Sequence, residues 1–368
     1  MGKEEKKPDK ILIVSSSPHL VSSSTSRRIM FEVIIGCLPA VGAALYFFRG
    51  QAALLLIACV ASALITEWLF NVVRKKAGTI GDGSAIATAV ILGLSLPPTM
   101  PTWAAAIGTV VAISVGKMVF GGLGCNIFNP AMMGRAFLMA CFGTMMTTWI
   151  PPVQEQAAIL QVRCDAGQEI AAVTEATPLA LAKQPIKDAA NDDKIKKATP
   201  LLVNQKLKAM FLGGTSGSAG ETSALFWLIG GIFLLYRQTI TWHIPVAVLG
   251  SAMLFATIPW LFDTFYIGPS GALEFGEAQI YANPLVHLFG GGLMMCAFFI
   301  ATDPVTCPLT KWGRILFGIG VGSLIMLIRL KGGYPEGVMY AILLMNAITP
   351  LLERWTRPKP FGGHSSRE

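Results

Sequence analysis

Charged side chains are scarce in this sequence. Asp, Glu, Lys and Arg make up 14% of the 368 residues, and hydrophobic residues make up 53%, whereas a soluble domain has about 25% charged residues. Because so few charges cannot cover a water-exposed surface, the composition excludes a soluble globular protein and predicts an integral membrane protein. The net charge of +8 does not indicate nucleic-acid binding, because the basic residues gather beside the ends of apolar runs, where lipid headgroups account for them.

Sequence motifs for metal binding, nucleotide binding and hydrolysis are also missing. The seven cysteines have no metal-type spacing, so we interpret them as buried small hydrophobes, without disulfides or an iron–sulfur centre owned by this chain alone. The four histidines form no metal constellation in the sequence. No Rossmann fingerprint, Walker sequence or hydrolase elbow occurs. The segment Met1 to Lys10 is charged and lacks the apolar stretch of a secretory signal peptide, which predicts an N-terminus in the cytoplasm.

Apolar runs occupy most of the sequence. A helix that crosses a hydrocarbon core needs roughly 20 apolar residues. The runs that approach or reach this length are Ile29–Phe48, Gln51–Val73, Thr102–Phe120, Pro130–Trp149, Ile244–Phe262, Pro284–Ala301, Gly313–Ile328 and Pro335–Leu352. Two shorter runs, Ser84–Leu96 and Ala224–Tyr236, need additional residues or a partial span. We therefore predict an all-α polytopic membrane protein with about ten transmembrane helices.

Basic residues alternate between the two sides of the predicted helices. One side carries Arg27, Arg28, Arg74, Lys75, Lys76, Arg237, Lys311, Arg314, Arg354, Arg357 and Lys359. The opposite loops hold fewer, chiefly Arg49, Arg329 and Lys331. The positive-inside rule places the first side, with both termini, in the cytoplasm. The polar segment from about Pro151 to Ser223 is then expected on the periplasmic side of a bacterial inner membrane.

The two halves of the sequence resemble each other. Leu96-Pro97-Pro98-Thr99-Met100-Pro101 before Trp103 parallels Thr302-Asp303-Pro304-Val305-Thr306-Cys307-Pro308 before Trp312. Each is followed by a Gly-rich run, a Gly-Gly pair and a helix that begins at Pro130 or Pro335. Because each half has an odd number of helices, the second copy must insert upside down, which predicts two inverted five-helix repeats. Such repeats usually place their working site near the bilayer midplane, at interrupted helices.

The chain is thereby divided into five expected segments. They are a cytoplasmic N-terminal segment (1–28), the first membrane repeat (29–149), a periplasmic loop region (150–223), the second membrane repeat (224–352) and a cytoplasmic tail (353–368). Within the loop region, acidic and basic residues alternate from Lys183 to Lys208. This pattern is typical of a solvated face or a flexible loop at a partner subunit.

Short motifs in a fixed order carry a resemblance to a known family. They are Ser16-Ser17-Pro18-His19 with Ser24-Thr25, Gly121-Gly122-Leu123-Gly124 with Asn126 and Asn129-Pro130, Thr174-Glu175-Ala176-Thr177-Pro178-Leu179, Thr302-Asp303-Pro304-Val305-Thr306, and Gly332-Gly333-Tyr334-Pro335. The sequence resembles the D subunit of the Rnf (Rsx) electron-transport complex, a relative of the B subunit of the sodium-pumping NADH:quinone reductase. The resemblance implies a complex that passes electrons between ferredoxin and NAD, with iron–sulfur, flavin-bearing and membrane subunits as partners.

The resemblance implies that Thr177 carries a covalent flavin. A threonine hydroxyl can form a phosphoester with the phosphate of FMN, which fixes the cofactor independently of any binding equilibrium. From the residues alone, Thr177-Pro178 equally predicts a turn that opens a short helix with proline in its first position. The expected flavin therefore depends on the family motifs.

Asn126 and Asn129 follow the Gly121-Gly122 pair, where a membrane helix is expected to begin. An amide side chain both donates and accepts hydrogen bonds, which suits the mixed polar edge of a flavin ring. By resemblance to the quinone-reductase relative, the two asparagines are expected to hold a second, non-covalent flavin, riboflavin. The alternative is helix capping, with Asn129 as the N-cap before Pro130.

Acidic residues inside apolar runs form the last candidate group. An intramembrane Asp costs roughly 2.5–3.5 kcal/mol on insertion scales, so Glu67 and Asp303 need a functional or structural partner. We expect Glu67, Asp303 and Glu336 to belong to a pathway for Na⁺ or H⁺ that is coupled to electron transfer. Glu32 and Glu336 lie close to run ends, where a helix N-terminus also accommodates an acid. Lys117 is expected to extend to the cytoplasmic surface, and Arg135 to need a buried partner or cavity.

Three classes of function remain open from the sequence. The preferred class is an electron carrier that is one subunit of an ion-translocating oxidoreductase and has no complete active site of its own. The second class is a channel or carrier built on inverted repeats, without a redox role. The third is a structural anchor for peripheral subunits.

Overall fold

The computed structural model describes residues 25–75, 79–153, 177–180, 182, 207–267, 273–275, 283–334 and 336–358. The Ser16–His19 motif, the alternating charges that begin at Lys183 and most of the segment before Thr177 lie outside the described residues.

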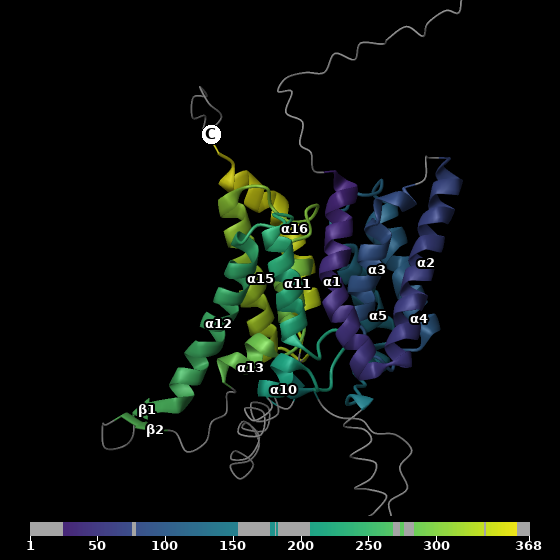
Figure 1. The fold of residues 1–368 in the computed structure, drawn as a ribbon. Coiled ribbons are helices and arrows are strands. Elements are labelled where there is room, and N and C mark those ends of the chain that lie inside the picture. Colours follow the sequence, from purple (N-terminus) through teal and green to yellow (C-terminus); the bar gives the residue numbers. More distant parts are fainter. Residues whose placement is uncertain are drawn as a thin grey trace, which may run out of the picture.

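Helices make up nearly all of the described structure (Figure 1). The first half contains α1 (Ser26–Phe48), α2 (Gly50–Arg74), the 3-10 turn η1 (Ile80–Asp82), α3 (Ser84–Leu94), α4 (Thr102–Ile113), the π-helical turn η2 (Ser114–Met118), α5 (Pro130–Cys141) and α6 (Gly143–Met146). The second half contains α10 (Leu207–Leu212), α11 (Ala224–Tyr236), α12 (His243–Thr264), α13 (Pro284–Phe289), α14 (Leu293–Met295), the π-helical turn η3 (Cys296–Ile300), α15 (Lys311–Lys331) and α16 (Val338–Thr356). After α12, β1 (Phe265–Ile267) and β2 (Leu273–Phe275) form a short antiparallel hairpin, which the apolar runs did not predict.

Four described helices are long and apolar enough to cross a membrane. These are α1, α2, α15 and the part of α12 from His243 to Phe262; α3, α11 and the helix Thr102–Met118 are shorter and also apolar. Their outward faces carry large exposed hydrophobic side chains, such as Ile57, Val73 and Leu254. So extensive an apolar surface is stable in lipid and not in water. The chain is therefore a membrane protein of several helices, as its composition predicted.

One expected long run is divided in the structure. Within Pro284–Ala301, α13 ends at Phe289 and the helix resumes at Leu293. Gly291, in the break, has a φ of +66°, a conformation that residues with a Cβ rarely adopt. The helix is thus interrupted inside the protein, and the Gly290 carbonyl oxygen at the break accepts a hydrogen bond from Arg329 Nη2 at 3.0 Å.

The helices of the two halves pack in the same pairs. In the first half α2 packs on α3 and α4, α4 packs on α5, and α1 packs on α3. In the second half α12 packs on α13 and α15, α15 packs on α16, and α11 packs on α14. The halves meet where α1 lies against α11 and where α5 lies against α16.

Glycine allows α1 and α11 to approach closely. A Cβ added to Gly230 of α11 would lie 2.0 Å from the carbonyl oxygen of Gly36 in α1, and one added to Gly36 would lie 3.1 Å from the Phe299 ring. Trp227 packs edge-on against Phe299 with ring centroids 4.9 Å apart. Small residues at a helix crossing are how membrane helices gain van der Waals contact without a hydrophobic driving force.

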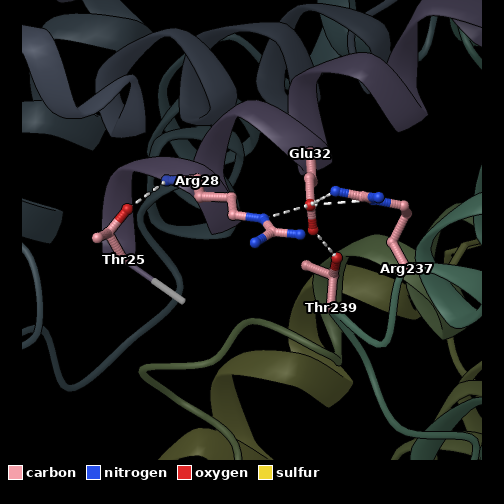
Figure 2. A network of polar contacts seen from close by, with 5 residues as sticks. All are labelled: Thr25, Arg28, Glu32, Arg237 and Thr239. Carbon is pink, nitrogen blue, oxygen red and sulfur yellow. Dashed lines mark hydrogen bonds and ion pairs between the residues drawn. The ribbon is translucent and has the colours of Figure 1, made fainter. Parts of the chain in front are cut away.

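Glu32 links the start of α1 to the end of α11 (Figure 2). Its Oε1 accepts hydrogen bonds from Arg28 Nε at 3.0 Å and from Arg237 Nη2 at 2.7 Å, and its Oε2 accepts one from the Thr239 hydroxyl. Because Glu32 is near the first residue of α1 and Arg237 follows the last of α11, the two helices run antiparallel. We call the end of the bundle where α1 begins the upper end, and the end where α1 stops the lower end (Figure 1).

We predict that Gly230→Ala destabilises the protein. The new Cβ meets backbone and not a flexible side chain, so α1 and α11 must move apart, at a cost of about 1–3 kcal/mol. Thermal unfolding in detergent, followed by loss of monodisperse protein, measures the effect. Gly250→Ala is the matched control, since nothing lies within 4 Å of its added Cβ and alanine is the better helix former. Equal stability of Gly230→Ala and the parent would contradict the packing described for α1 and α11.

Candidate functional site

Thr177 lies over a small polar pocket at the lower end of the bundle. The pocket has a volume of about 10 Å³, about the space of one water molecule. Its walls are Thr177, Pro178, Leu179, Met210, Thr215, Ser216, Glu221, Gly290, Gly291 and Glu336. We call this space the Thr177 pocket. These residues come from the segment of Thr177, from α10, from residues 215–221, from the break after α13 and from Glu336, which lies two residues before α16.

Thr177 begins a helical turn, as the Thr-Pro pair predicted. Its Oγ1 accepts a hydrogen bond from Ala180 N at 3.2 Å, and residues 178–180 are helical. The side chain is 4% exposed. An ester oxygen keeps lone pairs, so this capping bond is compatible with a phosphoester at the same atom.

Four charged side chains gather beneath and beside the Thr177 pocket. Arg135 Nη2 lies 2.6 Å from Glu336 Oε2 and 3.8 Å from Glu221 Oε1. Arg329 is 2% exposed and donates to the carbonyl oxygens of His287 at 2.5 Å and Gly290 at 3.0 Å. The cluster combines two basic and two acidic side chains, and buried ionised groups are stable only when opposite charges lie close to them.

The break between α13 and α14 lets this cluster approach the Thr177 segment. A Cβ at Gly290 would lie 2.6 Å from the Met210 side chain, and one at Gly291 would lie 2.7 Å from Leu179 and 3.0 Å from Arg329 Nη2. Glycine is therefore required at both positions for Leu179 and Arg329 to pack against the same backbone.

Several buried polar atoms here have no hydrogen-bond partner among the residues that the structure describes. They include Glu221 Oε1, Ser218 Oγ, Arg135 Nη1 and Arg329 Nε. Buried unpaired groups cost about 1–3 kcal/mol each, so a cluster of them indicates a site for a polar ligand. The residues around Thr177 thus fit a tethered cofactor with polar groups.

A larger cavity lies at the upper end, against Asn126 and Asn129. Its volume is about 60 Å³, which is room for a few water molecules. Asn129 caps α5, since its Oδ1 accepts from Ala131 N at 3.0 Å and Met132 N at 3.2 Å, and its Nδ2 donates to Ile300 O at 3.4 Å. The capping prediction is therefore confirmed for Asn129. Asn126 is 7% exposed and its Oδ1 has no partner in the described part of the chain, which leaves its amide available to a ligand.

The prediction for Lys117 was wrong. Lys117 does not extend to the surface: it is 2% exposed, its Nζ lies 2.6 Å from Glu67 Oε1, and it donates to Ser84 Oγ at 2.5 Å. The physical reason is η2, because a π-helical turn inserts an additional residue into the helix and rotates the following side chains. The Thr79 hydroxyl also donates to Glu67 Oε1 at 2.7 Å, while Glu67 Oε2 has no partner among the described groups.

The three acids expected in an ion pathway do not meet at one place. Asp303 lines the upper cavity and accepts hydrogen bonds from Val305 N at 3.4 Å and the Thr306 hydroxyl at 3.2 Å. Glu67 does not line this cavity. Its ion-pair partner Lys117 does, and so does Ser84, which accepts a hydrogen bond from Lys117. Glu336 belongs to the charge cluster at the lower end.

Two members of the lower cluster were missed by the sequence analysis. Glu221 stands in a polar segment outside the apolar runs, so nothing marked it as buried. Arg329 was counted as a loop residue at the end of a run. The sequence did contain a pattern that marks Arg329 as a counterpart of Lys117. Arg329 lies three residues before the Gly332-Gly333 pair, and Lys117 lies four residues before the Gly121-Gly122 pair.

Comparisons with known proteins agree with the motif analysis. The model of the NQR2, RnfD, RnfE family matches residues 13–362. The chain is 40% identical to the D subunit of the proton-translocating ferredoxin:NAD(+) oxidoreductase complex of Clostridium ljungdahlii, over 96% of both chains. It is 39% identical to the D subunit of the ion-translocating oxidoreductase complex of Pectobacterium atrosepticum, over 95% of this chain and 99% of the relative. It is 38% identical to the D subunit of the Na(+)-translocating ferredoxin:NAD(+) oxidoreductase complex of Acetobacterium woodii, over 95% of each. The chain belongs to the NQR2, RnfD, RnfE family.

Proposed function

We propose that this chain is the flavin-carrying membrane subunit of an ion-translocating ferredoxin:NAD oxidoreductase complex, and that it holds FMN on Thr177. The named relatives are subunits of such complexes. The observation that carries the proposal is the placement of Thr177, whose capping hydroxyl closes a pocket that contains a buried cluster of opposite charges and polar groups without partners in the described part of the chain.

Each residue of the lower site has a part in holding such a cofactor. Thr177 fixes its position through a covalent bond, and Gly290 and Gly291 allow Leu179 of the same segment to pack closely against the backbone of the break. Arg135 and Arg329 supply positive charge near a phosphate, while Glu221 and Glu336 keep the cluster neutral. When bound, FMN supplies one-electron and two-electron transfer; the protein positions the ring and sets the electrostatics around it.

A second flavin, riboflavin, is proposed for the upper cavity. Asn126 offers an amide oxygen there that no described group contacts, and Asn129 is held in place by its capping bonds. The cavity walls also include Phe298 and Phe299, which provide apolar contact for a flat ring.

The proposed architecture comprises about ten spans in two inverted repeats. The recurrence of the same packing pairs in each half and the antiparallel contact of α1 with α11 support it. The membrane repeats cover 29–149 and 224–352. The basic residues near the ends of α1, α2, α11 and α16 support a cytoplasmic upper end in the bacterial inner membrane, with both termini there, and a periplasmic region 150–223 that bears Thr177. Iron–sulfur, flavin-bearing and membrane subunits of the complex are the proposed partners.

For ion movement, we assign Glu67 and Asp303 to the upper cavity and Glu336 to the lower cluster. Glu67 supports this assignment because one of its carboxylate oxygens is buried without a partner among the described residues. Buried acids that retain such an oxygen are suited to binding a proton or Na⁺. The relatives' names include both a proton-translocating and a Na(+)-translocating complex, so the proposal covers either ion.

Thr177→Ala is expected to remove covalent flavin. We predict a fluorescent band for the parent chain in denaturing gels when it is expressed with a flavin transferase, and none for Thr177→Ala. Thr148→Ala, at an exposed threonine outside this motif, is the matched control and should keep the band. Mass spectrometry of the peptide locates the added mass. A parent preparation without colour or band would instead favour a channel or an anchor over an electron carrier.

Neutralising the acids at the upper cavity is expected to impair ion movement and not flavin attachment. In proteoliposomes containing the whole complex, Glu67→Gln and Asp303→Asn should each reduce ion uptake driven by ferredoxin oxidation by about tenfold or more, since each removes a buried charge that is rarely incidental. Glu353→Gln controls for loss of an acid elsewhere; its Oε1 accepts from Leu309 N at 3.1 Å. Unchanged uptake in both cavity variants would contradict the pathway.

A further inference from the structure

A wide groove opens at the upper end of the bundle, between the start of α15 and the end of α16 (Figure 1). Its volume is about 680 Å³, within the range of about 300–1,000 Å³ typical of ligand sites. We call it the α15–α16 groove. Together with two prolines, its walls are Leu309, Thr310, Glu353, Arg354 and Arg357.

We propose that the α15–α16 groove binds an anionic phospholipid of the membrane leaflet at the upper end, with the lipid phosphate on Arg354 and Arg357 and an acyl chain along Leu309. A guanidinium holds a phosphate through parallel N–H donors, and basic pockets between membrane helices at the cytoplasmic side take anionic headgroups. The assignment goes beyond the redox role and does not depend on either flavin.

The two arginines of the groove have no partner among the residues that the structure describes. Both are exposed, and neither makes a hydrogen bond or an ion pair there. Arg357 follows Glu353 by one helical turn, but Glu353 Oε1 instead accepts from Leu309 N at 3.1 Å. The helix dipole favours basic residues at the end of α16, yet it does not require a groove beside them. Both guanidinium groups are therefore available to an anion from outside.

The walls of the groove are held in place without a ligand. Thr310 and Thr356 share a hydrogen bond between their hydroxyl groups at 2.5 Å, and Thr310 Oγ1 caps α15 by accepting from Gly313 N at 3.0 Å. Arg314 donates from Nε to the Pro308 carbonyl at 3.0 Å. The ends of the two helices are thus joined, and a preformed site binds with a smaller loss of conformational entropy.

Exposed apolar side chains place the groove at the boundary between lipid tails and headgroups. Trp312, in the first turn of α15, is 69% exposed, and Trp355, in the last turn of α16, is 68% exposed. Leu309 on the groove wall is 72% exposed. Tryptophan is enriched at the membrane–water interface. A ligand here meets positive charge and apolar surface together, which a phospholipid satisfies and a soluble anion does not.

The test measures lipid binding by the full chain, purified in an uncharged detergent and freed of lipid. Native mass spectrometry counts bound phosphatidylglycerol, which is anionic, and phosphatidylcholine, which is not. We expect the parent to bind phosphatidylglycerol more tightly, and Arg354→Gln with Arg357→Gln to weaken that binding by about tenfold or more. Arg354→Lys with Arg357→Lys keeps the charge and should recover part of the affinity.

The matched control removes the same charge from the upper end outside the groove. Arg27 and Lys75 are exposed there and do not line the groove. Arg27→Gln with Lys75→Gln should bind phosphatidylglycerol as the parent does. Equal loss of affinity in the control and in the groove variant would show general attraction of anionic lipid to a basic surface and would overturn the site.

Three further outcomes decide what occupies the groove. Unchanged affinity in Arg354→Gln with Arg357→Gln refutes the site. Inorganic phosphate or glycerol phosphate that binds as tightly as phosphatidylglycerol makes the groove a site for a soluble anion and contradicts the lipid. In the purified whole complex, phosphatidylglycerol that is retained by the parent and lost from the groove variant supports the proposal. Exclusion of the lipid from the whole complex, when the isolated chain binds it, assigns the groove to an acidic partner subunit instead.

Discussion

The pairing of Arg135 with Glu336 is the interaction on which the lower end of the protein depends. The two side chains lie 2.6 Å apart although the residues are 201 positions apart in the chain. A charge without a partner is costly at this depth, so neither residue is stable here without the other. Arg135 belongs to α5 and Glu336 precedes α16, so the pair joins helices from the two halves. Glu336, which this pair holds in place, also lines the pocket beneath Thr177.

A buried basic residue anchors α3 in the first half and α13 in the second half. Lys117, at the end of α4 and η2, donates to Ser84, the first residue of α3. Arg329, near the end of α15, donates to carbonyl groups in and after α13. Each cation is 2% exposed and each precedes a Gly-Gly pair. The two halves thus use a similar construction at opposite ends of the bundle, which supports the proposed inverted repeats.

The membrane class and the long helices could be predicted from the sequence, but the pairing of the buried charges could not. Hydropathy was sufficient for the membrane class and for the long helices α1, α2, α12 and α15, because span length follows from bilayer thickness. Asn129 was predictable as a cap because capping is local in sequence. The position of Lys117 depends on a π-helical turn that composition does not indicate, and the burial of Glu221 depends on contacts with residues from both halves. Such long-range contacts have no local pattern.

The two cations meet opposite termini of their helices, and this explains why the two ends differ chemically. Arg329 meets the end of α13, where unpaired carbonyl groups accept its hydrogen bonds directly and favour a cation. Lys117 meets the start of α3, where the backbone offers N–H groups, and Asp82 accepts from Ser84 N at 2.8 Å. Lys117 must therefore take side-chain acceptors, Glu67 and Ser84. Within the described structure, the upper end consequently retains a buried carboxylate oxygen without a partner beside a cavity, which suits an ion. The lower end retains guanidinium nitrogens of Arg135 and Arg329 together with Glu221 Oε1 without described partners, which suits a ligand that both accepts and donates hydrogen bonds.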